Sequence, residues 1–204
     1  LDEAYRVAME ELWNENPADP DVGTLYAEAN MSCQAWNYWT NDYEPVERAE
    51  EIVALLEECM ALAPRHPGAH HFYIHMVESS GKAERGVPSA DLLGELMPGS
   101  GHLRHMPSHI YANVGRYADA VKVNEEAVAL DDEYFAAYGK PTFYLNYYAH
   151  NIQFLVFGAM MEGRKELSFQ YVDKLESLIT DPIIEMFAPF IDGMNAMRFH
   201  NYIR

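Results

Sequence analysis

The stretch that decides the fold runs from Gly101 to Glu133 and reads GHLRHMPSHIYANVGRYADAVKVNEEAVALDDE. It has the features of two helices joined at Gly115, where the first helix must stop and the chain must turn. Small residues beyond the glycine allow the two helices to approach closely, and tyrosines fill the space around them. These residues are Tyr111, Tyr117, Ala120 and Ala127. We therefore expect a helical hairpin that ends in an acidic turn at Asp131-Asp132.

The same hairpin recurs along the chain with a period of 34 residues. Pro98 lies 34 residues after Pro64, and both occupy the closing position of a unit. Gly163 stands in a second copy of the Gly115 turn, and no run of alternating β-branched residues favours a sheet. The predicted units of this single array are 1–19 (partial), 20–66, 67–100, 101–134, 149–182 and 183–204 (partial). Insertions at 37–49 and 135–148 break the period.

The pattern resembles the tetratricopeptide repeat, whose conserved small, Tyr, Gly and Ala positions match Ser108, Tyr111, Gly115, Tyr117, Ala120 and Ala127. The unit departs from that repeat at Asn124, where the family usually has an aromatic residue. The resemblance implies an all-α fold of helical hairpins stacked in a right-handed solenoid, with a concave groove that holds a protein, a peptide or a small ligand. Motifs within 66–75 and 101–117 are also similar to bacterial tetratricopeptide-repeat proteins of unassigned activity, over roughly residues 15–165.

The composition excludes several classes of function. The chain has 204 residues, with 14 Lys and Arg against 32 Asp and Glu, which gives a net charge of −18. Because duplex nucleic acids and anionic membrane surfaces attract basic proteins, this charge disfavours both as partners. No apolar run approaches the roughly 18 residues of a membrane span. Two cysteines are too few for a disulfide scaffold. We expect this chain to be an internal piece of a longer protein, and its sequence leaves the cytoplasm and the periplasm open as compartments.

The histidines follow the repeat. His71 and His75 form one pair spaced by four residues, and His105 and His109 form another pair 34 residues later. Both pairs take the same two groove-facing positions in successive hairpins. Side chains four residues apart lie about 6 Å apart on a helix, and neighbouring helices pack about 8–10 Å apart. We therefore expect the four imidazoles to converge on one site.

Imidazole and carboxylate ligands together suit a divalent transition metal such as Zn, Fe, Cu or Mn. The predicted metal ligands are His71, His75, His105, His109 and Glu78. Further candidates for binding a ligand at neighbouring positions are Glu28, His102, His150, Asn151 and Arg104. Four interpretations stay open. The cluster could belong to a binding module that holds a metal or small ligand, or to a metal-dependent enzyme that activates water or substrate. It could also form a pH-responsive surface, because clustered imidazoles repel one another once they are charged, or the histidines could only form hydrogen bonds. Neither pair has the glutamate of a His-Glu-x-x-His metalloprotease motif.

Two details bear on this hypothesis. Pro107 lies between His105 and His109, so the first helix of that unit either begins near the proline or is kinked there. His70 occupies a position that is often a core aromatic in the family, which predicts a packing role.

Overall fold

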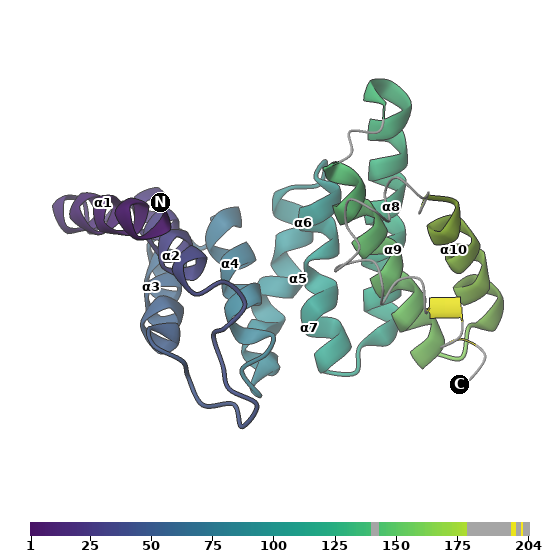
Figure 1. Ribbon diagram of the computed structural model, residues 1–204, viewed down its shortest axis with the longest axis horizontal. Coiled ribbons are helices and arrows are strands. Elements are labelled where there is room, and N and C mark those ends of the chain that lie inside the picture. Colours follow the sequence, from purple (N-terminus) through teal and green to yellow (C-terminus); the bar gives the residue numbers. More distant parts are fainter. Residues whose placement is uncertain (140–142, 179–196, 199–200, 202–204) are drawn as a thin grey trace. The chain divides into compact units, whose positions relative to one another are not determined.

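The computed structural model describes residues 1–139, 143–178, 197–198 and 201. Apart from one isolated bridge between Trp39 and Pro45, its regular structure over these residues is helical, which confirms the predicted all-α class (Figure 1). The elements are α1 (Asp2–Glu15), α2 (Pro20–Cys33), α3 (Ala49–Leu62), α4 (Pro67–Val77), η1 (Ala83–Gly86), α5 (Val87–Leu96), α6 (Gly101–His105), α7 (Pro107–Asn113), α8 (Tyr117–Tyr138), α9 (Tyr144–Met161) and α10 (Lys165–Leu178). The chain divides into two compact units, Leu1–Met97 and Pro98–Arg204.

Local capping explains where the helices of the first unit begin. The Asp19 side chain accepts hydrogen bonds from the backbone of the first turn of α2, and a proline takes the first helical position. His66 does the same for α4, because its Nδ1 accepts from Ala69 N at 3.0 Å and Pro67 follows it. Helices α2 and α4 both pack against α3, and Leu56 of α3 and Ile74 of α4 are fully buried.

The predicted insertion in the first unit forms a loop over 34–48 that is tied to α4 and its C-terminal turn. Trp39 Nε1 donates to the carbonyl of Met76 at 2.6 Å, and a Cβ on Gly81 would lie 2.6 Å from the Tyr43 ring. Three residues of this loop other than glycine have positive φ: Trp36, Tyr43 and Glu47. Such dihedrals persist only where surrounding contacts hold them.

Glycine turns set the hairpins of the second unit. Gly115 (φ 77°) separates α7 from α8, and Gly163 (φ 70°) separates α9 from α10. A residue with a side chain rarely adopts this left-handed conformation, so glycine is the residue that allows both turns. Helix α9 packs against α8 on one side and α10 on the other (Figure 1). The predicted turns at both glycines are confirmed.

The predicted acidic turn at Asp131-Asp132 is wrong. Helix α8 continues through both residues to Tyr138 and stops at Gly139, whose φ is 80°. Asp131 is 1% exposed, and its carboxylate accepts from Tyr144 Oη at 2.7 Å and from Asn151 Nδ2 at 2.8 Å. Tertiary contacts with α9 therefore satisfy a carboxylate that the sequence suggested to be at the surface. Within the predicted insertion 135–148, residues 135–138 belong to α8 and residues 144–148 belong to α9. The predicted partial unit 183–204 lies almost wholly outside the described residues.

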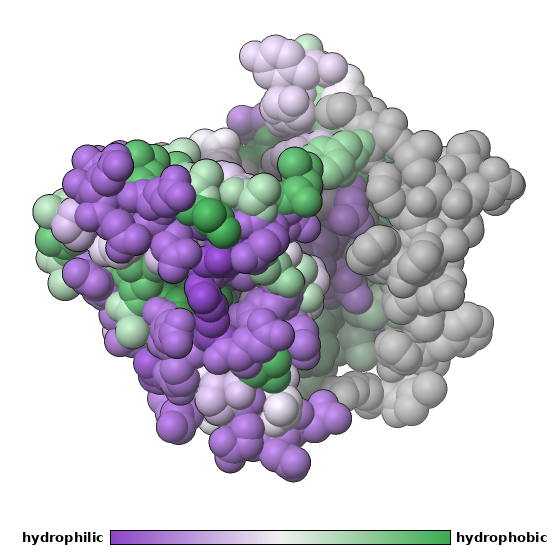
Figure 2. Space-filling view, turned by 60° about the vertical axis from the view of Figure 1, so that its left-hand side comes forward, coloured by the Kyte–Doolittle hydropathy of each residue, from purple (hydrophilic) through white to green (hydrophobic). Residues whose placement is uncertain are grey.

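The face of the first unit that is seen in Figure 2 is mainly polar. Figure 2 turns Leu1–Met97 toward the viewer and shows a largely hydrophilic face with scattered hydrophobic patches. Exposed apolar side chains of this unit include Leu12, Leu25 and Trp36. Over the part of the chain that the structure describes, no helix has the length and apolar character needed to cross a bilayer.

Candidate metal centre

Pro107 interrupts the first helix of the second unit without separating the two histidines. Helix α6 ends at His105 and α7 begins at Pro107, but Met106 between them keeps helical dihedrals (φ −49°, ψ −38°). His105 and His109 therefore stay one turn apart, with ring centroids separated by 4.9 Å. Of the two alternatives for Pro107, the structure supports a break within a helical path rather than a late helix start.

Asn124 of α8 fixes which nitrogen of His105 faces His109. The Asn124 Nδ2 donates to the carbonyl of Ala120 at 2.8 Å, so its Oδ1 is the atom that meets His105 Nδ1 at 2.6 Å. His105 Nδ1 must then carry the proton and donate it. The lone pair of neutral His105 is left on Nε2, which lies 3.0 Å from His109 Nε2.

Helix α9 supplies a third imidazole. His150 lies 4.9 Å from His105 and 5.5 Å from His109 between ring centroids. One ligand nitrogen of each histidine lies within 4.8 Å of the other two. His105 is fully buried, His109 is 8% exposed and His150 is partly buried. We call His105, His109 and His150 the histidine triad.

Phe154 forms an apolar cover on the histidine triad. Its ring lies 5.0 Å from His105, 4.5 Å from His109 and 4.9 Å from His150. One turn of α9 places Phe154 beside His150, because the two residues are four apart. The triad is thus held between Asn124 on one side and an aromatic ring on another.

Burial makes the neutral imidazole the stable form of His105. Loss of solvation lowers the pKa of His105 well below its ordinary value, and the neighbouring His109 and His150 lower it further. The hydrogen bond to Asn124 acts in the opposite direction but is the weaker influence. A neutral imidazole is the form that binds a metal.

Three further predicted residues of the second unit lie outside the triad. His102 is a neighbour, with its ring 6.2 Å from His105 and 4.8 Å from Tyr147. Arg104 forms an ion pair with Glu126 of α8. Asn151 is fully buried and donates to Asp131.

The remaining predicted residues belong to the first unit. His71 and His75 lie on α4 with ring centroids 5.0 Å apart, and His75 Nδ1 lies 3.0 Å from Glu78 Oε1. Trp36 meets the His75 ring edge-on at 5.4 Å. Glu28 accepts a hydrogen bond from Ser32 within α2. The two histidine pairs lie in different compact units, and their convergence on one site stays a prediction.

His70 has the packing role that its repeat position predicts. It is buried, with Nδ1 2.8 Å from Ser89 Oγ and Nε2 3.0 Å from the Pro64 carbonyl. Sequence reasoning noted Asn124 only as a departure from the repeat and missed its bond to His105. A polar residue at a position that is usually aromatic, facing a helix that carries histidines, was the available signal. Phe154 gave no signal of its own.

Comparisons with known proteins bear on the fold. No protein-family model matches the sequence, and a search of curated proteins finds no match. Among solved structures, MamA from Desulfovibrio magneticus RS-1 is similar, with a TM-score of 0.63 at 14% identity over 87% of this chain and 85% of that one. A structure of MamA AMB-1 also gives a TM-score of 0.63, at 18% identity over 87% of this chain and 89% of that one. MamA is a tetratricopeptide-like helical protein.

This chain has a tetratricopeptide-like fold. The structural likeness therefore agrees with the resemblance drawn from the Gly101–Glu133 hairpin. At these identities it concerns the arrangement of the helices alone.

Proposed function

We propose that this chain is a tetratricopeptide-like binding scaffold that holds a divalent transition metal at the histidine triad. The observation that carries the proposal is the convergence of three imidazole nitrogens from α6, α7 and α9. Repeats of this kind generally present a surface to a protein or peptide partner, which we propose as the second ligand of the scaffold.

The distances within the triad suit a metal. Two nitrogens bound to zinc at about 2.0–2.1 Å in tetrahedral geometry lie about 3.3 Å apart. His105 Nε2 and His109 Nε2 are 3.0 Å apart, so a small shift of either ring would accommodate the ion in place of the proton between them. His150 would provide the third nitrogen.

The surroundings of the triad resemble those of metal-bound histidines in general. A ligating histidine usually donates its other ring N–H to an oxygen that fixes its orientation, and Asn124 Oδ1 does this for His105. Three neutral nitrogen ligands favour Zn²⁺ or copper over Mn²⁺, which prefers oxygen ligands. Among the described residues, the group of convergent ligand atoms at the triad consists of three imidazole nitrogens and contains no carboxylate.

A weaker second metal site is proposed in the first unit, on His71 and His75. Glu78 Oε1 lies within hydrogen-bond distance of His75 Nδ1, so His75 Nε2 is the nitrogen that would bind the metal. Two imidazoles on one helix bind a metal less tightly than three, so the triad should fill first.

Titration of the metal-free chain with Zn²⁺, and with Co²⁺ as a visible-absorption probe, tests the triad. We expect one tight site per chain and a Co²⁺ spectrum typical of nitrogen ligands. His150→Gln should weaken this site by at least about tenfold, because it removes one of three ligands. His66→Gln is the matched control: it also removes one imidazole, but this side chain contacts Asp21 and Ala69 N and belongs to neither group of convergent ligand atoms.

Two outcomes would contradict the proposal. One is a folded, metal-free chain that binds neither ion. The other is a tight site that persists in His150→Gln but disappears in His71→Gln, which would assign the metal to α4 and not to the triad.

A further inference from the structure

A cleft of about 360 Å³ lies in the first unit, where α2 packs against both α1 and α3. Apolar side chains from all three helices line it. Trp13 of α1, Tyr26 of α2 and Leu55 of α3 are partly buried, and Ile52 of α3 is only 2% exposed. We call this the Trp13 cleft. Part of its apolar lining is therefore open to solvent, although the three helices are packed together.

Packing holds the two aromatic side chains of the Trp13 cleft in place. A Cβ on Gly23 of α2 would lie 2.8 Å from Trp13 Cζ3, so the edge of the indole ring packs directly on the backbone of α2. Tyr26 Oη donates to Glu10 Oε1 of α1 at 3.2 Å. A surface whose side chains are already ordered loses less conformational entropy when a partner binds. The two aromatic side chains therefore form a surface that is prepared for a partner.

Two carboxylates of α3 lie beside this apolar lining. Glu51 and Glu58 both line the Trp13 cleft, and both are exposed. Neither has an ion pair among the described residues, whereas Glu57 of the same helix pairs with Arg85. Glu51 and Glu58 are seven residues apart, which places them on one face of α3 and about 10.5 Å apart along its axis. They therefore offer a partner two negative charges that are two helical turns apart.

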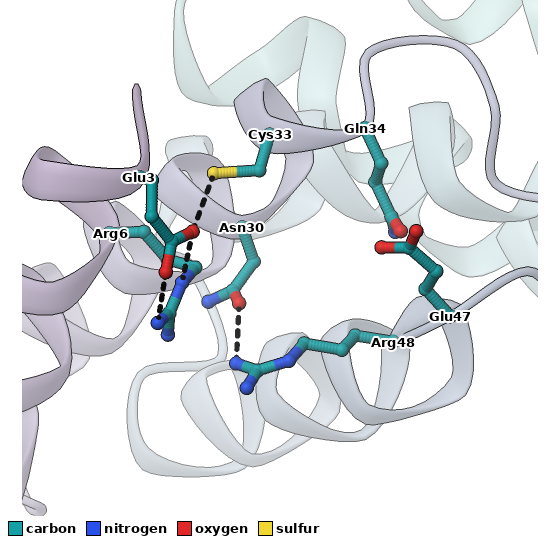
Figure 3. Close-up of a pocket in the computed structure, with 7 residues that line it drawn as sticks. All are labelled: Glu3, Arg6, Asn30, Cys33, Gln34, Glu47 and Arg48. Carbon is teal, nitrogen blue, oxygen red and sulfur yellow. Dashed lines mark hydrogen bonds and ion pairs between the residues drawn. The ribbon is translucent and has the colours of Figure 1, made fainter. Parts of the chain in front are cut away.

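Arg48 is the single basic residue among the described residues that line the Trp13 cleft. It directly precedes α3, and its Nη1 donates to Asn30 Oδ1 at 3.1 Å (Figure 3). Hydrogen bonds from Arg6 lower the pKa of Glu3 and of Glu10, and the charge of Arg48 lowers both further. Because the positive charge of Arg48 already acts on these carboxylates of α1, the charge that the cleft offers to a partner is negative.

The Trp13 cleft lies on the opposite side of α2 from Glu28, which was predicted to face the ligand-binding groove. Tyr26 and Asn30 line the cleft and are four residues apart, so they share one face of α2. Glu28 is two residues from each, which is about 200° around the helix. None of the histidines of α4 lines the cleft. The cleft is therefore distinct from both the predicted groove and the histidine sites.

The charge of the whole unit favours a basic partner. Residues 1–97 contain 19 Asp and Glu against 5 Lys and Arg, so they carry −14 of the net charge of −18. A second copy of this chain would present the same negative charge and would be repelled. A segment rich in Lys and Arg is attracted and is guided to the surface before contact. The apolar lining in addition requires apolar side chains on that segment.

We propose that the Trp13 cleft binds an amphipathic helix of a partner protein that carries basic residues on both sides of an apolar stripe. On such a helix, Lys or Arg at positions i and i+7 would pair with Glu51 and Glu58. Apolar residues at i+3 and i+4 would pack on Trp13, Ile52 and Leu55. The inference rests on the proposed binding scaffold, for which it names the chemistry of the partner. It does not involve the histidine triad, which lies in the other unit.

Binding of a labelled helical peptide to the full chain, measured by fluorescence anisotropy, tests the proposal. The peptide repeats Lys at i and i+7 around Leu at i+3 and i+4, and two control peptides replace every Lys with Glu or every Leu with Ala. We expect the basic peptide to bind at micromolar concentration in low salt, and each control to bind at least about tenfold more weakly. Higher salt should weaken binding, because the carboxylates that pair with the peptide are exposed.

Neighbouring residues of α3 supply the matched variants, with circular dichroism to confirm that each is folded. Glu51→Arg reverses a charge that lines the cleft and should weaken binding of the basic peptide at least about fivefold. Glu50→Arg makes the same change of net charge in the same helical turn, but Glu50 does not line the cleft, so the affinity should change by less than about twofold. Leu55→Ala removes part of the apolar lining and should weaken binding about tenfold.

The proposal is overturned if Glu50→Arg and Glu51→Arg weaken binding equally, because net charge alone would then attract the peptide. It is also overturned if Leu55→Ala binds the peptide like the wild type, if the acidic peptide binds as tightly as the basic one, or if the folded chain binds neither. Zinc titration reports on the histidine triad separately. A failure here with an intact zinc site would therefore remove the helix-binding cleft and leave the proposed metal site standing.

Discussion

Replacing Asn124 with leucine tests the role of the polar residue that stands where the repeat usually has an aromatic. Leucine has a similar volume but cannot accept the proton of His105 Nδ1, which lies 2.6 Å from Asn124 Oδ1 in a fully buried environment. A buried donor without an acceptor costs about 1–3 kcal/mol. Ser108 Oγ is 3.4 Å from the same nitrogen and is the nearest alternative acceptor. We therefore expect the free energy of unfolding to fall by about 1–2 kcal/mol.

The same substitution should weaken metal binding more than folding. Without Asn124 the proton of His105 is no longer directed to Nδ1, so Nε2 is less often the free ligand atom. Loss of such an orienting partner typically lowers metal affinity about 10–100-fold. Asn124→Asp is the counterpart, because a carboxylate still accepts from Nδ1, and we expect it to retain zinc affinity.

Two measurements test whether Asn124 orients His105. Urea unfolding, followed by far-ultraviolet circular dichroism with a chelator present, gives the stability of the metal-free protein. Competition with a chromophoric chelator gives zinc affinity. If Asn124→Leu unfolds at the wild-type urea concentration and binds zinc as tightly as the wild type, then Asn124 does not orient His105 and the tautomer argument is incorrect.

Three other expectations follow from the structure. In the metal-free protein, His105 of the unfolded chain takes up a proton near pH 6.5, whereas the buried native ring does not. The free energy of unfolding should therefore fall as the pH drops below about 6.5, by at most about 1.4 kcal/mol per pH unit. Urea midpoints at several pH values would show this slope, and His105→Gln should remove it. Gly101→Ala would place a Cβ 2.0 Å from the buried Asp131 carboxylate, so we expect the free energy of unfolding to fall by about 1–3 kcal/mol. An unchanged midpoint of thermal or urea unfolding would contradict the packing at this site. Trp39→Phe removes the hydrogen bond to the Met76 carbonyl, so it should lower the free energy of unfolding by about 1 kcal/mol and increase proteolysis of the loop 34–48. Wild-type resistance to protease in this variant would show that other contacts hold the loop.

The sequence alone was enough to predict where the chain turns between helices. Gly115 and Gly163 both adopt left-handed dihedrals, which glycine tolerates and other residues avoid, so a repeat of the glycine predicts a repeat of the turn. The expected acidic turn failed because Asp131 lies inside α8, where Tyr144 and Asn151 satisfy its carboxylate. Burial also raises the pKa of Asp131, although these hydrogen bonds oppose the shift. The residues next to Asp131 in the sequence do not indicate that its carboxylate has partners on another helix.

The candidate site was predicted in part. The spacing of His105 and His109 indicated neighbouring rings on one helix face, and the rings are neighbours despite Pro107. His150 was named only as one of several residues at groove positions. Its place beside the pair depends on how α9 packs against the preceding helices, which spacing along the chain does not specify.

By itself, the sequence determined the helical repeat, its turns and the recurrence of histidines, because all three depend on the order of residues within one or two helical turns. The tertiary structure decided which of these histidines have neighbouring rings. It also decided that Asn124 Oδ1 accepts the hydrogen bond of His105 Nδ1. These features arise where separate helices meet, and the distances between helices are set by the packing of the whole unit.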